Sequence, residues 1–373
     1  MDREDLIEER AIAITLSEDN YIRHLPVESF RVQNRGGKGL KGVATKAEDT
    51  PQLIITCFSK DRLLIFTDQG RVYGLKAWET PLGSRHSRGG HIRNLLESLR
   101  EDENIVTILP ISRELLETPE GNYLLFATKL GLIKKTRLEE YVRINRNGKY
   151  ALRFKLDGDS LVNVRCGTDD SDIVMISSTG FASRFACQKI RSSGRVSAGV
   201  YGIKTGNRKG ADGGHVVGMI ATNNTETQIL TISKNGMAKR SRLGTADKIP
   251  YLDAEGVQKV DKETGDLMER TDGYRKTNPG AKGAFTMNIN KEDNDEIIAA
   301  RHIPDLDDNL FVLTKKGMMI RLRANQTKET KSKKSKGTRI MELRNKGKSG
   351  FSDEIIFVAR LPAELIDDED GSF

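Results

Sequence analysis

Short apolar stretches recur along the chain in pairs, and a four-residue polar turn separates the two members of each pair. The turn begins with Ser or Thr and ends with Gly or Asn, and the second stretch carries a basic residue. The six turns run over residues 17–20, 67–70, 128–131, 177–180, 233–236 and 314–317. A type I turn followed by Gly or Asn in the left-handed region connects antiparallel strands, and the Ser or Thr hydroxyl can bond the turn's own backbone. The pattern therefore predicts six β-hairpins.

The spacing of these hairpins indicates a repeat architecture. The final residues of successive turns are separated by 50, 61, 49, 56 and 81 residues. The flanking Ile, Val, Leu, Phe and Tyr residues favour strands. Units of about 50 residues, each with about four short strands, are typical of propeller-like arrays. Two unrelated β-sandwiches remain an alternative on the spacing alone.

A second loop follows each hairpin, and these second loops are rich in Lys and Arg. They fall within residues 33–41, 84–92, 143–149, 191–195, 275–282 and 331–336. If equivalent loops face one side of a ring, their charges form a curved basic track, although a run of charges is usually a solvated face. Lys and Arg outnumber Asp and Glu by 61 to 53, which gives a net charge of +8. This excess favours a polyanionic partner.

The first of these loops, Gln33–Gly39, reads Q-N-R-G-G-K-G. Glycine permits sharp turns and close approach of the backbone to another surface. Arg35 and Lys38 place two positive charges between those glycines, which suits a phosphate backbone. A solvated turn is the other interpretation. Aromatic residues make up only 6% of the chain and do not interleave with the basic loops, so duplex binding is expected rather than stacking on single strands.

The sequence carries no signature of catalysis, and we predict no catalytic residue, metal site or cofactor. Gly347-Lys348-Ser349 ends like a phosphate-binding loop, but the required earlier glycine is replaced by Glu342. The five histidines lack metal-ligand spacing, and no Cys-His or Ser-His-Asp signature is present. Cys57, Cys166 and Cys187 form neither a metal motif nor a disulfide framework, which indicates a reducing compartment.

No apolar run approaches the roughly 18 residues that a membrane span needs. The N-terminus is charged throughout and does not resemble a signal peptide. We therefore expect a soluble, cytoplasmic protein without membrane contact.

The Gln33–Gly39 heptapeptide closely resembles the gyrase A box, the hallmark of the C-terminal domain of the DNA gyrase A subunit. The family pattern is Q-[RK]-R-G-G-[RK]-G, and only Asn34 departs from it. Residues 63–76 look like the next module of that domain, and E-D-L-I-E-E at 4–9 is similar to the junction that follows the catalytic region of that family. The resemblance covers nearly all of residues 4–366 and implies an all-β, six-bladed β-pinwheel of four-stranded blades that exchange strands.

What the resemblance implies about function is positive-handed, non-sequence-specific wrapping of duplex DNA in a bacterial, ATP-dependent type II topoisomerase. ATP and Mg²⁺ would serve other parts of the enzyme, in which two A subunits and two B subunits assemble so that negative supercoils are introduced. The DNA-binding residues would be Gln33, Asn34, Arg35, Gly36, Gly37, Lys38, Gly39, Lys41, Arg85, Arg88, Arg143, Arg146, Lys149, Arg191, Arg195, Arg275, Lys276, Lys282, Lys333, Lys334 and Lys336.

Two alternatives stay open. The C-terminal domain of the topoisomerase IV A subunit shares the fold but typically has a degenerate box. A propeller that serves as a protein-interaction platform would lack the basic track.

The chain is expected to divide into a linker at 1–10, the pinwheel at 11–363 and an acidic tail at 364–373. Residues from about 253 to 276 interrupt the fifth module and are expected to form a flexible polar excursion. The tail is either a solubilising end or a mimic of DNA charge that competes for the basic track.

Overall fold

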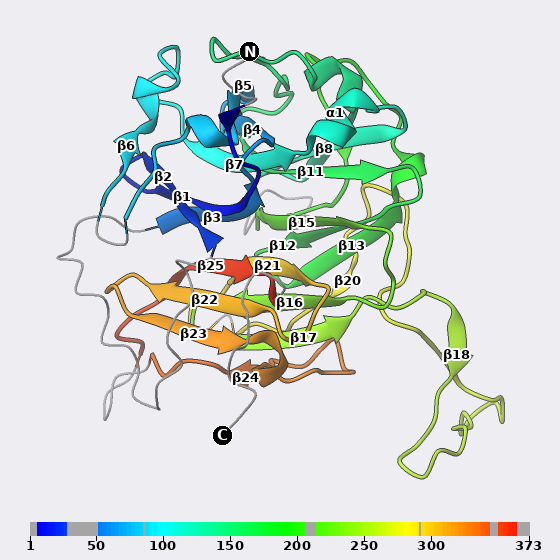
Figure 1. The fold of residues 1–373 in the computed structure, drawn as a ribbon. Coiled ribbons are helices and arrows are strands. Elements are labelled where there is room, and N and C mark those ends of the chain that lie inside the picture. The colour runs from blue at the N-terminus through cyan, green and yellow to red at the C-terminus, as the bar shows by residue number, and fades with distance from the viewer. Residues whose placement is uncertain are drawn as a thin grey trace.

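The computed structural model describes residues 6–27, 51–84, 87–205, 214–290, 292–343 and 350–363. Its architecture is a ring of antiparallel sheets, each built on one of the predicted hairpins (Figure 1). The hairpins are β1 (Ala11–Ser17) with β2 (Tyr21–Pro26), β4 (Arg62–Thr67) with β5 (Arg71–Lys76), β8 (Asn122–Thr128) with β9 (Leu132–Arg137), β12 (Asp172–Ser177) with β13 (Phe181–Ala186), β16 (Gln228–Ser233) with β17 (Met237–Arg242), and β22 (Asn309–Thr314) with β23 (Met319–Arg323).

The six turns have the predicted geometry. Each ends in a residue of positive φ, from 64° at Asn20 to 97° at Gly131. The amide of that residue donates to the carbonyl of the leading Ser or Thr over 2.9–3.1 Å. The next amide donates to the hydroxyl of the same Ser or Thr, over 3.0 Å at Ser17 and 3.3 Å at Thr67. The hairpins are thus fixed locally, as the sequence pattern predicts.

An inner strand completes the central side of each hairpin. These strands are β3 (Pro51–Phe58), β7 (Ile105–Ile111), β11 (Leu161–Thr168), β15 (Val216–Thr222), β21 (Ile297–Ile303) and β25 (Ile355–Leu361). Each inner strand contacts the inner strands of the neighbouring blades. The last strand, β25, lies beside β3, so the ring closes between the ends of the chain (Figure 1).

The outermost strand of a blade comes from the next module along the chain. These strands are two residues long: β6 (Gly90–His91), β10 (Lys149–Tyr150), β14 (Val200–Tyr201), β20 (Ala284–Phe285) and β24 (Thr338–Arg339). β6 follows the second hairpin but pairs with β2 of the first blade, and the same shift recurs around the ring. In the described part of the chain the sixth blade has three strands, in the order β23-β22-β25. The prediction of an all-β, six-bladed pinwheel is confirmed.

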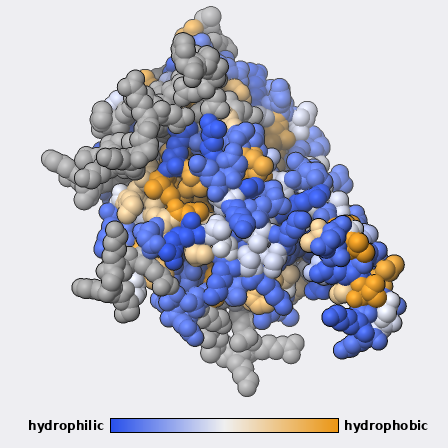
Figure 2. Space-filling view, turned by 90° about the horizontal axis from the view of Figure 1, so that it is seen from below, coloured by the Kyte–Doolittle hydropathy of each residue, from blue (hydrophilic) through white to orange (hydrophobic). Residues whose placement is uncertain are grey.

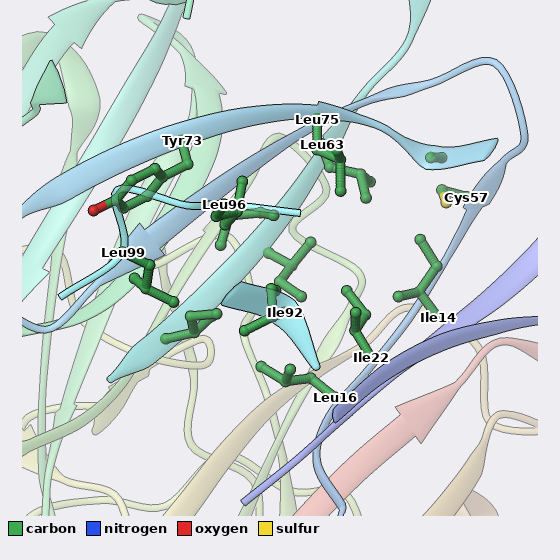
Figure 3. Packing of buried hydrophobic residues seen from close by; sticks show 14 of the residues in the cluster. Ile14, Leu16, Ile22, Cys57, Leu63, Tyr73, Leu75, Ile92, Leu96 and Leu99 are labelled. Atoms are coloured by element: carbon green, nitrogen blue, oxygen red, sulfur yellow. The ribbon is translucent and has the colours of Figure 1, made fainter. Parts of the chain in front are cut away.

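Apolar clusters between successive blades hold the ring together. In β4, Leu63 and Ile65 face the first blade, whereas Leu64 and Phe66 face the third. Both faces of the strand are therefore buried, which explains its continuous apolar run. Figure 3 shows the first of these clusters, in which Leu63 lies among side chains from both hairpins. Each such side chain contributes about 1.5–3 kcal/mol by leaving water.

The helices within the described residues are few and short. They are the 3₁₀ turns η3 (Ala77–Glu79), η4 (Ile92–Asn94), η5 (Leu138–Tyr141), η6 (Cys187–Lys189) and η7 (Ala324–Gln326), and the helix α1 (Arg113–Glu117). No helix among the described ranges is long and apolar enough to cross a bilayer.

One excursion leaves the ring, and we call residues 245–272 the arm. It contains β18 (Lys248–Pro250) paired with β19 (Glu269–Thr271), and it projects from the body in Figure 1. Its base is closed because the amide of Tyr274 donates to the carbonyl of Leu243 over 2.8 Å. The arm starts earlier than the predicted excursion at 253–276. Arg275 and Lys276 follow it and belong to the rim.

Candidate nucleic-acid interface

Each exchanged strand is reached by a segment that crosses the hairpin of the preceding blade, and we call these segments straps. The described straps lie within residues 77–84 and 87–89, 138–148, 187–199, 274–283 and 324–337. Each strap makes a backbone hydrogen bond to the same position of the second hairpin strand. Examples are Ser193 N to Lys135 O at 2.9 Å and Thr277 N to Arg184 O at 2.7 Å. The crossing positions are His24, Gly74, Lys135, Arg184 and Arg240.

The basic side chains at these crossing positions are buried and hold the straps. Arg184 pairs with Asp172 and donates to the carbonyls of Leu243, Gly244 and Tyr274 over 2.8–2.9 Å. The side chain that holds a strap differs from blade to blade: it is His24 in the first blade and Lys135 in the third. In the second blade the crossing position is glycine, and Arg62 on the adjacent strand donates to the Ile144 carbonyl instead. The buried basic residues of the third, fourth and fifth hairpins are therefore structural.

Two lysines one position earlier also anchor straps. Lys134 Nζ donates to the carbonyls of Ala151 and Arg195, each over 2.6 Å. Lys239 Nζ donates to the carbonyls of Ser332 and Lys333 over 3.0 and 3.1 Å. Burial lowers the pKa of Lys134 to about 7 and the pKa of Lys239 to about 8. Their ammonium groups point into the protein and are not available to a ligand.

A glycine ends each described strap where the chain passes closest to the preceding blade. A Cβ at Gly283 would collide with the Ala182 carbonyl oxygen, and one at Gly199 would collide with that of Ile133. Gly89 and Gly337 meet the same restriction, whereas a Cβ at Gly148 would collide with the ring of Tyr73. Counted back from these glycines, each strap ends in a heptapeptide that corresponds in position to Gln33–Gly39.

The straps carry the predicted basic residues to the outer edge of the ring, because the strands that they lead into are the outermost ones. Most are exposed, and Arg195 and Lys333 are half-buried. The exposed residues are Arg88, Arg143, Arg146, Lys149, Arg191, Arg275, Lys276, Lys282, Lys334 and Lys336. The predicted residues Gln33, Asn34, Arg35, Gly36, Gly37, Lys38, Gly39, Lys41 and Arg85 lie outside the described residues.

The exposed cations differ in how far they are already engaged. Arg146 pairs with Glu79 at 2.6 Å, and Lys276 pairs with Asp172 at 3.0 Å. By contrast, Arg191, Arg275 and Lys334 have no side-chain hydrogen bond or ion pair within the described ranges. These three are free to contact an anion.

Lys333 points inward. Its ammonium lies 4.1 Å from the centre of the Tyr274 ring, and burial lowers its pKa to about 8. Of the predicted lysines on this strap, Lys334 and Lys336 are the exposed ones.

The sequence-based prediction includes no exposed aromatic rings at the rim, because it expects aromatic residues to lie apart from the basic loops. The structure places a ring at the end of the exchanged strand that follows three of the straps: Tyr150, Tyr201 and Phe285 are 49%, 48% and 38% exposed. The signal was present as a recurring glycine, any residue, then a ring, as in Gly148-Lys149-Tyr150. The expectation that aromatic residues do not interleave with basic loops is therefore wrong.

Neither a metal centre nor a reactive thiol is evident in the described part of the chain. No three His, Cys, Asp or Glu side chains there come together as a possible metal site. Burial raises the pKa of Cys57 to about 12 and that of Cys187 to about 11, so both thiols stay protonated at neutral pH.

The fold and the rim define a strand-exchanged β-propeller whose basic straps line its outer edge. The sequence matches the family model of the DNA gyrase C-terminal domain, a β-propeller, over residues 12–50, 61–112, 122–167, 171–223, 227–247 and 308–348. The chain belongs to this family. The unmatched residues 248–307 include most of the arm.

Curated relatives include the DNA gyrase A subunits of Staphylococcus epidermidis and Staphylococcus aureus, each 36% identical over 344 residues and 92% of this chain. The chain spans about a third (34%) of the length of these relatives.

Two solved structures share the fold. The C-terminal domain of DNA gyrase A aligns with a TM-score of 0.67 at 20% identity, over 95% of this chain and 100% of that one. The C-terminal domain of DNA topoisomerase IV aligns with a TM-score of 0.66 at 19% identity, over 96% of this chain and 95% of that one.

Proposed function

We propose that this chain binds duplex DNA along its strap-lined rim and wraps it with positive handedness, as part of a topoisomerase that introduces negative supercoils. The observation that carries the proposal is the recurrence of exposed basic residues on the equivalent straps of successive blades. Cations repeated around a curved edge suit a duplex that bends along it.

Phosphate contacts are the energetic basis of the proposed wrap. Bending 20–30 base pairs by 40–90° costs about 1–6 kcal/mol on elastic estimates, and repeated contacts must offset this cost. The chain presents these cations on loops and two-residue strands rather than on a helix that could enter the major groove. Binding is therefore expected to tolerate different sequences.

Strand cleavage and ATP hydrolysis are assigned, in this proposal, to other parts of the enzyme. The proposed assembly contains two A subunits and two B subunits. The family membership and the relatives, which are A subunits of DNA gyrase, support this context. The chain itself would act by shaping DNA.

Salt dependence tests the electrostatic part of the proposal. The logarithm of affinity should fall with the logarithm of salt at about −0.9 per phosphate contacted. Arg191→Ala, Arg275→Ala and Lys334→Ala should each make the slope shallower by about 1, because each removes a phosphate contact. Arg113→Ala on α1, which is exposed but outside the straps, is the matched control.

A filter-binding titration with unrelated duplexes of equal length measures these slopes. Affinity that ignores salt, or strong preference for one of the unrelated sequences, would contradict the proposal. The same titration separates it from a protein-interaction platform, which would not bind duplex DNA.

A further inference from the structure

Three successive blades present a ring at one position of their outermost strand. Tyr150, Tyr201 and Phe285 each end an exchanged strand, and each pairs with the first residue after a hairpin turn. Those residues are Arg71, Leu132 and Phe181. A single exposed ring needs no explanation, but the same exposure at equivalent places in three modules does.

Cations lie close to Tyr150 and to the pair formed by Phe285 and Phe181. Arg71 Cζ lies 6.0 Å from the centre of the Tyr150 ring, and Arg100 Nη2 lies 3.5 Å from the Tyr150 hydroxyl. Phe285 packs on Phe181 at 4.4 Å between ring centres, and Lys282 Nζ lies 4.6 Å from the Phe181 ring.

The first blade repeats the arrangement with an imidazole. His91 packs edge-on against Tyr21 at 5.4 Å, and Arg88 lies 4.3 Å from the Tyr21 ring. Ring and cation therefore occur together at the rim of the first, second and fourth blades.

The geometry decides which part of DNA these rings fit. One face of Phe285 is covered by Phe181, and the Tyr150 hydroxyl already has a partner. The rings also stand on different blades, so they cannot form a continuous platform for successive bases. A duplex that follows the rim turns its minor groove inward about once every 10 base pairs and presents deoxyribose C–H groups there.

Resting on the proposed function, we propose that Tyr150, Tyr201 and Phe285 pack against the deoxyribose walls of the inward-facing minor groove. The strap cations hold the phosphates on either side. Ring contacts of this kind bury apolar surface and release no counterions. They therefore add affinity that does not depend on salt, unlike the phosphate contacts.

Ring removal in the full chain tests this inference. Burial of about 40 Å² per ring corresponds to about fivefold in affinity. A variant that combines Tyr150→Ala, Tyr201→Ala and Phe285→Ala should bind a mixed-sequence duplex about a hundredfold more weakly, with an unchanged salt slope. Tyr150→Phe with Tyr201→Phe should retain wild-type affinity.

Two further variants guard against trivial explanations. Tyr251→Ala removes a ring that is 37% exposed on the arm, outside the straps and the exchanged strands, and should leave affinity unchanged. Because Phe285→Ala disturbs the Phe181 pair, Tyr150→Ser with Tyr201→Ser tests the inference with that pair intact. The expected loss is then about 25-fold. Thermal unfolding of each variant checks that it is folded.

Three results would overturn the inference. The first is an affinity for duplex DNA that is unchanged in the ring variants. The second is a salt slope that falls together with the affinity. The third is a loss of single-strand binding that exceeds the loss of duplex binding. The last result would mean stacking on bases. If the wild-type chain binds no duplex, the proposed function itself fails. If it binds but the rings have no effect, only this inference fails.

Discussion

Basic side chains of two kinds coexist in the third, fourth and fifth blades, and burial separates their roles. Arg184 and Lys239 are buried and each donates to a carbonyl oxygen of a strap, Arg184 to that of Tyr274 and Lys239 to that of Ser332. Arg191 and Lys334 are exposed on the straps themselves. The first kind builds the rim, and the second kind gives it charge.

Lys134 gives the fold a specific pH dependence. Its folded pKa of about 7 lies below the ordinary lysine value near 10.4, because burial disfavours the ammonium. Between these two values the unfolded chain binds a proton that the folded chain does not. The contribution of Lys134 to stability therefore rises with pH, by at most about 1.4 kcal/mol per pH unit.

The Lys134→Met variant lacks this titration, so its stability relative to wild type should fall as pH rises from about 7 to about 10. Urea unfolding at several pH values measures the difference. Lys334→Met, at an exposed position, is the control and should follow wild type. Parallel pH profiles for Lys134→Met and wild type would contradict the prediction.

At the scale of elements, the hairpins could be predicted from sequence but the exchanged strands could not. A hairpin turn such as 67–70 is fixed by bonds within a few residues. An exchanged strand such as Lys149–Tyr150 has only two residues and therefore shows no periodicity. Its place depends on the distant edge of β5, with which it pairs. Strand exchange was predicted only through the resemblance to a known domain.

Some features of the candidate site could likewise be predicted from sequence, and others could not. The charges of the straps could be predicted, since each loop is basic in the sequence. That Lys333 turns inward onto Tyr274, while Lys334 stays exposed, depends on packing between segments far apart in the chain. Neighbouring lysines in a sequence carry no signal that separates them.

The arm is an element that the ring does not need. Its exposed apolar residues include Leu252, Val260 and Leu267, and none of its side chains belongs to the inter-blade clusters. In Figure 2 apolar side chains gather at the end of this projection. It holds eight acidic and four basic residues, for a net charge of −4, whereas the whole chain carries +8.

Deleting residues 245–272 and joining Gly244 to Gly273 should change the free energy of unfolding by less than about 1 kcal/mol. The two glycines lie against each other, so the join requires little rearrangement. Duplex affinity at low salt should rise, because the deletion removes a net negative charge from the neighbourhood of the strap.

Urea unfolding and duplex titration of the deletion variant check both expectations. Replacement of the same residues by a Gly-Ser linker of equal length is the matched control, since it removes the charge but keeps the chain length. A loss of several kcal/mol in either variant would show that the arm supports the fold.

At the scale of the whole molecule, the number of blades could be predicted from the spacing of the turns. The closure of the ring depends on contacts between the first and last blades. β25 lies against β3, which brings the sixth blade beside the first. Among the described residues, β23 has no exchanged strand on its outer side, whereas β2, β5, β9, β13 and β17 each have one. From its position in the repeat, we expect the segment after β2 that contains Gln33–Gly39 to supply the strap of the sixth blade.

This correspondence makes Gln33–Gly39 the strap that we expect to decide the wrap. DNA held at the junction of the first and last blades must bend to follow the remaining rim. Replacing the heptapeptide with alanines should therefore cost only part of the affinity, because the straps of the other blades keep their cations. It should abolish the handed wrap, so that a reconstituted enzyme loses negative supercoiling but retains ATP-dependent relaxation.

The linking-number change trapped when nicked circles are ligated, at protein levels that saturate the DNA, measures the wrap directly. The control combines Arg191→Ala, Arg275→Ala and Lys334→Ala, which removes three exposed cations but leaves the heptapeptide intact. This control should bind more weakly in dilute solution yet trap wild-type writhe at saturation, because the bend at the junction is still imposed. If the alanine heptapeptide also traps wild-type positive writhe, the segment is one contact among several. Handedness would then have to arise from the ring of straps as a whole.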